Sequence, residues 1–109
     1  MPLRRRYVTA VRLEILFRKN RLYKRMLEGE FTSRVLREHP ADPSFGQVPG
    51  TQSQMVGYYN SHGAQVALVH QYEQPDGRLG GRSHKPTPKR IRLGDTIYLQ
   101  QGKRRRHSN

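Results

Sequence analysis

The sequence contains no cysteine and no tryptophan. The absence of cysteine excludes disulfides, zinc sites built on thiolates and cysteine nucleophiles. A thiol-free chain suits a reducing compartment, so we expect a cytoplasmic protein. The sequence also lacks any apolar run near the roughly 18 residues that a membrane-spanning helix needs. We therefore expect no membrane span.

The N-terminal segment superficially resembles a signal peptide, because cations precede an apolar run in MPLRRRYVTAVRLEILFRKN. Arg12 and Glu14 interrupt that run, and no small-residue cleavage site follows it. We therefore expect a soluble, intracellular protein.

Acidic residues are scarce: eight Asp and Glu stand against 21 Lys and Arg, which gives a formal net charge of +13. So large an excess repels itself in a compact state and is usually tolerated when the partner is an anion, most often a nucleic acid. An anionic membrane surface and an acidic protein partner are the alternatives.

The charge is unevenly distributed along the chain. Residues 1–39 carry eleven Lys and Arg against four Glu, residues 40–81 carry one Arg against three acids, and residues 82–109 carry nine Lys and Arg against one Asp. Two basic ends therefore flank a nearly neutral middle. With 109 residues, 33% of them hydrophobic, we expect one domain with a modest core.

Residues 1–39 are predicted to form a basic helical N-terminal region. Alternate residues from Tyr7 to Phe17 fit a strand, whereas Val11, Ile15 and Leu22 fit one helical stripe. We favour helix for 7–17 and for 19–28, with a strand over 7–17 as the alternative. A second short helix over 32–39 is expected to end before the following proline.

Residues 40–52 are predicted to form a Pro/Gly-rich connection, and residues 53–100 an antiparallel β-meander of three to five strands. The strand signals cover 53–59, 64–73 and 91–99, with turns at NSHG, QPDG and the Gly-Asp hairpin link. The two prolines of KPTPKR predict a stiff extended strap over 85–90, and residues 101–109 a basic disordered tail. The fold class is therefore α+β, with the helical segment packed on the meander.

The candidate nucleic-acid-binding residues are cations from both basic ends, because a cation that meets a phosphate releases a counterion. The alternative is that these side chains form a solvated surface. The set is Arg4, Arg5, Arg6, Arg18, Arg21, Arg25, Arg82, Lys85, Lys89, Arg90, Arg92, Lys103, Arg104, Arg105 and Arg106.

His70 and His84 are the candidate catalytic residues. Imidazole titrates near neutral pH, so this pair predicts acid–base cleavage of RNA without a metal, provided that the intervening segment folds back. The alternative is that His70 is a strand residue bonded to a neighbour and His84 a loop residue. The histidine spacing matches no metal-ligand pattern, so we expect no metal site and no cofactor.

Residues 50–81 resemble a group of short uncharacterised bacterial proteins in the segment GTQSQMVGYYNSHGAQVALVHQYEQPDGRLGG. The pattern of that group is a strand ending in His-x-Tyr, then Pro-Asp-Gly, a Gly-rich step and Pro-Asp-Pro-Lys. The likeness extends over residues 50–99 and departs at Thr87, where the pattern has an acidic residue. It supports the hairpin and implies no activity.

These observations predict a small nucleic-acid-binding protein, and we favour binding over catalysis. RNA is preferred because tyrosines on a sheet suit stacking on unpaired bases. The basic ends would contact phosphates around a neutral sheet. The alternatives are a metal-independent, toxin-like ribonuclease using His70 and His84, and an accessory protein of a larger nucleoprotein assembly. Membrane binding through residues 1–28 is a more distant alternative.

Overall fold

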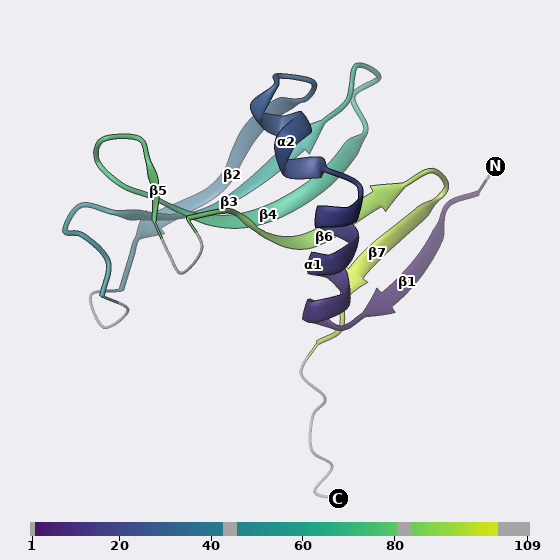
Figure 1. Ribbon diagram of the computed structural model, residues 1–109, viewed down its shortest axis with the longest axis horizontal. Helices are drawn as coiled ribbons and strands as arrows, with labels where there is room; N and C mark the ends of the chain where they lie inside the picture. Colours follow the sequence, from purple (N-terminus) through teal and green to yellow (C-terminus); the bar gives the residue numbers. More distant parts are fainter. Residues whose placement is uncertain (1, 43–45, 81–83, 103–109) are drawn as a thin grey trace, which may run out of the picture.

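Two helices and seven strands make up the described part of the chain, residues 2–42, 46–80 and 84–102 of a computed structural model (Figure 1). In chain order the elements are β1 (Arg4–Val8), α1 (Ala10–Lys19), α2 (Leu22–Leu27), β2 (Thr32–Pro40), β3 (Gln52–Tyr59), β4 (Gln65–Glu73), β5 (Leu79–Gly80), β6 (Thr87–Leu93) and β7 (Thr96–Gln100). The strands form one sheet in the order β1-β7-β6-β4-β3-β2, and β5 pairs with β4.

The sheet is mixed. β1 runs parallel to β7, and the other pairs of the described sheet are antiparallel. The α+β class is confirmed in outline. The range 53–100 contains five strands that pair antiparallel, but the sheet as a whole is larger than predicted and mixed, because the N-terminal region supplies both edge strands, β1 and β2.

Thr9 divides the ambiguous segment 7–17 into a strand and a helix. Its Oγ1 accepts a hydrogen bond from the backbone N–H of Arg12 at 3.1 Å and caps α1. The residues before Thr9 instead pair with β7. The helix prediction is therefore confirmed from Ala10 onward, and the strand alternative applies to the two residues before Thr9.

Residues 32–39 form a strand, so the predicted second helix is wrong. β2 pairs with β3 along its length, with one register shift after Val35. The helix preference of Arg, Leu and Glu amounts to only tenths of a kcal/mol per residue, and the hydrogen bonds to β3 override it. The strap predicted over 85–90 is likewise a strand from Thr87 onward, because its residues pair with β4.

The predicted turns are confirmed. In the turn after β4, the backbone N–H of Gly77 donates to the carbonyl of Gln74 at 2.8 Å. Gly77 has a φ of 87°, which glycine adopts without steric cost. The turn before β4 closes in the same way, from Gly63 to Asn60 at 2.9 Å. A tight link at Gly94 joins β6 to β7.

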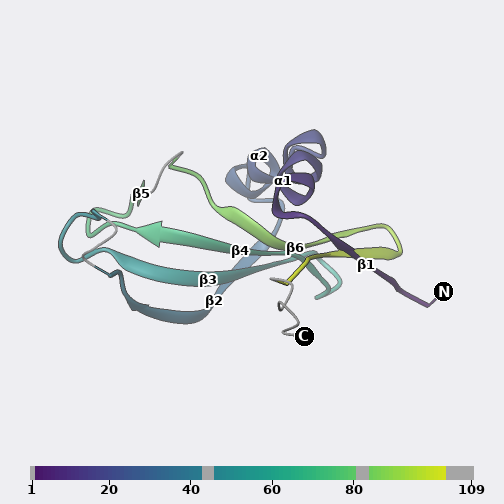
Figure 2. The same ribbon diagram turned by 90° about the horizontal axis from the view of Figure 1, so that it is seen from below.

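Both helices cover the same face of the sheet, as Figure 2 shows from the side. We call this the helix side and the opposite surface the open face, because no helix of the described residues covers it. The core lies entirely on the helix side. It consists of Leu13, Phe17, Leu22 and Met26 from the helices and Val56, Ala67, Val69 and Ile91 from β3, β4 and β6.

Because this core is small, single truncations in it are expected to be costly. Leu13 on α1 is 0% exposed, and we expect Leu13→Ala to lower the free energy of unfolding by about 3 kcal/mol. Val11 on the same helix is 69% exposed, so Val11→Ala is the matched control and should change stability by less than about 0.5 kcal/mol. Urea denaturation followed by circular dichroism measures both, and equal losses would contradict this packing of α1.

Candidate nucleic-acid interface

Strand alternation determines which side chains reach the open face. On β4, Ala67 and Val69 belong to the core, so Leu68, His70 and Tyr72 point to the opposite side. Residues paired across an antiparallel ladder share a face. The β3 partners on the open face are therefore Gly57 opposite Leu68, Met55 opposite His70 and Ser53 opposite Tyr72.

Six cations occupy positions on the open face. Arg34 and Arg37 of β2 pair with Gly57 and Met55, and Arg90 of β6 pairs with Leu68. Lys89 lies at the register shift of β6, where it lines a hollow described below. The full set is Arg5 of β1, Arg34 and Arg37 of β2, and Lys89, Arg90 and Arg92 of β6.

Both carboxylates of the strands face the helix side. Gln54 lies two residues before the core residue Val56 and therefore on the same face. It donates through Nε2 to Glu38 of β2 and to Glu73 of β4, the latter at 3.2 Å. Gln71 Nε2 in turn donates to Gln54 Oε1 at 2.8 Å. Gln54 is only 3% exposed, so this row of amides holds the two acids in place. Among the described strand residues, the open face therefore carries cations and no carboxylate.

Tyr59 lies against the sheet surface over Gly57. A Cβ added at Gly57 would stand 2.6 Å from Tyr59 Oη and 2.9 Å from two of its ring carbons, so only glycine leaves room for the ring here. The guanidinium carbon of Arg34 lies 5.6 Å from the ring centroid, within cation–π range. Gln65 Nε2 donates to Tyr59 Oη at 3.3 Å. Three residues therefore position the ring, namely Gly57, Arg34 and Gln65, and Arg34 places a cation beside it.

A shallow hollow of about 440 Å³ lies on the open face between β1, β3, β4, β6 and β7. Its lining combines the apolar side chains of Met55, Leu68 and Leu99 with the ring of Tyr7 and the cation Lys89. Tyr7 is 61% exposed. The hollow is open to solvent, and it offers an apolar and aromatic surface beside a positive charge.

His70 and His84 have separate hydrogen-bond partners. His70 Nε2 lies 2.7 Å from Ser53 Oγ, and its ring meets Tyr72 edge-on at 4.8 Å between centroids. His84 Nδ1 lies 3.1 Å from the carbonyl oxygen of Leu79, in a backbone conformation with a φ of 55°. These contacts match the structural alternative for each residue. The ribonuclease hypothesis stays a prediction.

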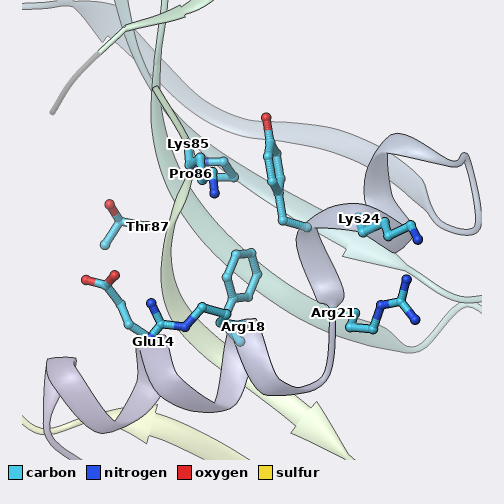
Figure 3. A pocket seen from close by; sticks show the side chains of 9 residues that line it. Glu14, Arg18, Arg21, Lys24, Lys85, Pro86 and Thr87 are labelled. Atoms are coloured by element: carbon cyan, nitrogen blue, oxygen red, sulfur yellow. The ribbon is translucent and has the colours of Figure 1, made fainter. Parts of the chain in front are cut away.

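The other predicted contact residues are dispersed. Arg25 donates through Nε to Glu30 at 2.9 Å. Arg4 and Arg6 alternate with Arg5 along β1, so they do not share its face. A separate group on the helix side, shown in Figure 3, contains Arg18, Arg21 and Lys85. Five predicted residues lie outside the described part of the chain, namely Arg82, Lys103, Arg104, Arg105 and Arg106.

Sequence reasoning missed four residues of the open face. The prediction of a helix over 32–39 concealed that Arg34 and Arg37 lie on one face of a sheet, and the prediction of a helix over 7–17 did the same for Tyr7. The position of Tyr59 depends on Gly57 two residues earlier, and that glycine within a strand signal was the one local sign of a close approach.

Metals, membranes and relatives give no further guide to the site. In the described ranges, no three His, Asp or Glu side chains gather as a metal ion would require. No helix in the same ranges is both long and apolar enough to cross a membrane. Comparison of the chain with known proteins found no matching family model, curated protein or solved structure. The likeness to short bacterial proteins therefore stays a prediction.

His70 is expected to make folding stability depend on pH. Its pKa lies below the ordinary value of 6.5, first because of burial and then because of the positive charges of Lys89 and His39. As the pH falls, the unfolded chain therefore takes up a proton at this residue before the folded chain does. The contribution of neutral His70 is present above pH 6.5 and declines below it, until the folded chain is also protonated.

Thermal unfolding at several values between about pH 7.5 and 5.5 tests this dependence. His70→Gln should lose less stability over this range than the parent. His62→Gln, which alters an exposed histidine in a turn, is the control and should follow the parent. An unchanged pH dependence in His70→Gln would contradict the expectation.

Proposed function

We propose that the protein binds single-stranded nucleic acid on the open face of its sheet, with RNA preferred over DNA. The observation that carries the proposal is the sorting of charge between the two faces. Six cations occupy the open face, whereas both strand carboxylates are held on the helix side by Gln54. Phosphates would contact the cations, and bases would stack on Tyr59 and Tyr7.

A single strand fits this face better than a duplex does. Duplex DNA is read by an element inserted into a groove, but α1 and α2 have ten and six residues and pack on the other side of the sheet. A sheet that carries the exposed ring of Tyr7 and the half-buried ring of Tyr59 beside cations suits unpaired bases. RNA is favoured because its loops and ends present such bases for recognition.

Binding is favoured over cleavage for a geometric reason. Acid–base cleavage needs two titratable groups on opposite sides of one phosphate. His70 is engaged by Ser53 on the open face, and His84 by the backbone carbonyl of Leu79. The cations and rings of the open face need no such pairing to hold a strand.

The affinity for single-stranded RNA should fall steeply with salt. Fluorescence anisotropy with an oligonucleotide of about 12 residues, at about 50 to 200 mM salt, should give a linear plot of log K against log salt. Arg34→Gln and Arg90→Gln should each weaken binding and reduce the slope by about 0.7.

The control for these variants is Arg12→Gln. Arg12 is an exposed residue of α1 on the helix side, so its replacement removes the same charge from a different surface. Affinity and slope should change little. A flat salt response of the parent, or equal effects of Arg12→Gln and Arg34→Gln, would contradict binding on the open face.

Tyr59 should contribute by stacking rather than through its hydroxyl. Stacking on an aromatic side chain is worth about 1–3 kcal/mol per base, so we expect Tyr59→Leu to weaken RNA binding about 5- to 150-fold. Tyr59→Phe keeps the ring and should stay within about threefold of the parent. Anisotropy at one salt concentration measures both. A loss in Tyr59→Phe as large as in Tyr59→Leu would exclude stacking at this position.

A further inference from the structure

We propose that a pocket on the helix side binds a nucleotide through both its terminal phosphate and its base. The pocket has a volume of about 540 Å³ and lies between α1, α2 and residues 85–87. We call it the helix-side pocket; Figure 3 shows it from close by. Because the sheet separates it from the open face, this proposal does not rest on the proposed function.

Four cations from four segments line the helix-side pocket. Arg18 comes from α1, Arg21 from the turn between the helices, Lys24 from α2 and Lys85 from the segment before β6. Within the described ranges, no carboxylate lies within ion-pair distance of Arg18, Arg21 or Lys85, and Lys24 has only a long, exposed contact of 3.9 Å with Glu28. Figure 3 shows Arg18 on the side of Glu14, and Arg21 and Lys24 on the other side. Cations without a close carboxylate partner around one pocket suit a phosphate group.

The backbone conformation of Arg21 indicates that its side chain has a role beyond the turn. Arg21 has φ 53° and ψ 34°, the left-handed conformation. Glycine or asparagine adopts this conformation with less strain than arginine. An arginine kept in a strained backbone conformation at the edge of a cavity is typical of a binding position.

The walls of the pocket provide the surface for a base. Phe17, which is 6% exposed, the buried Pro86 and the half-buried ring of Tyr23 all line the pocket. Lys85 Nζ lies 5.9 Å from the centroid of the Tyr23 ring, so a cation already stands next to the aromatic face. A base stacked on Tyr23 places its phosphate within the group of cations.

Glu14 makes the two sides of the pocket differ in charge. It is the single carboxylate among the lining residues, and Figure 3 shows it beside Thr87, on the opposite side of the pocket from Arg21 and Lys24. Its charge repels phosphate, whereas a carboxylate accepts hydrogen bonds from the amino groups of bases. The phosphate is therefore assigned to the side of Arg21 and the base to the side of Glu14.

Isothermal titration calorimetry with AMP, GMP, adenosine and inorganic phosphate tests the pocket. At least one of AMP and GMP should bind, and adenosine and phosphate should each bind at least about tenfold more weakly, because each supplies only half of the contacts. Equal affinity for phosphate and the nucleotide would reduce the pocket to an anion site and overturn the proposal. So would the absence of binding by both nucleotides.

Variants separate binding from folding. Arg21→Gly relaxes the left-handed turn while removing a cation, so its unfolding temperature should equal or exceed that of the parent while nucleotide affinity falls about tenfold. Tyr23→Leu should also lower the affinity for the nucleotide but not for phosphate. Arg12→Gln removes a cation of α1 that does not line the pocket, so it is the control and should bind as the parent does. Unchanged affinity in Arg21→Gly would overturn the proposal.

The nucleotide can be free or can be the 5′-phosphorylated end of a strand. Two RNA oligonucleotides that differ only in a 5′-phosphate or a 5′-hydroxyl distinguish these sources. A strand end is indicated if the 5′-phosphate raises affinity in the parent but not in Arg21→Gly, and a free nucleotide if it does not. Arg34→Gln should weaken RNA but not AMP or GMP, so failure of the open face and failure of the helix-side pocket are separable.

Discussion

The packing of α1 and α2 on one face of the sheet is the interaction on which the rest of the structure depends. Eight buried apolar side chains form this core, and each contributes on the order of 2 kcal/mol by burial. A net charge of +13 opposes folding by self-repulsion. The flat form, 47 × 45 × 23 Å, spreads the cations over both faces and brings many pairs beyond the Debye length of about 8 Å. One layer of helices is enough to form the core, and the other face of the sheet is covered by no helix of the described residues (Figure 2).

The sorting of charge between the faces depends in turn on strand register. A shift of one residue in β2 would carry Glu38 to the open face and turn Arg37 toward the helices, because side chains alternate with a period of two. Gln54 opposes such a shift, since its amide is shared between Glu38 and Glu73 and is itself bonded by Gln71. A buried polar row on the helix side thus maintains a cationic surface on the other side.

Local signals were sufficient for the middle of the chain and insufficient for its N-terminal part. The turn at Gln74–Gly77 and the strands beside it follow from proline, glycine and alternation over a few residues. β2 does not, because its pairing with β3 is formed across an intervening connection and overrides a weak helical preference. The same cause limits the prediction of the candidate site. The basic composition of the C-terminal block is enough to predict Lys89 and Arg90, whereas Arg34 and Arg37 can be assigned to the open face only when β2 is known to be a strand.

One short segment supplies cations to both faces of the sheet. Lys85 lines the helix-side pocket, and Lys89 and Arg90 lie four and five residues later on the open face, after the strand has entered the sheet. An anion held at either site lowers the positive potential that the other cations of this segment experience. Such a coupling is reciprocal, so a nucleotide at the proposed helix-side site and a strand at the proposed open-face site would change each other's affinity by the same factor. The sign follows from charge: phosphates on the two sides of a thin sheet repel one another, so each would weaken the binding of the other.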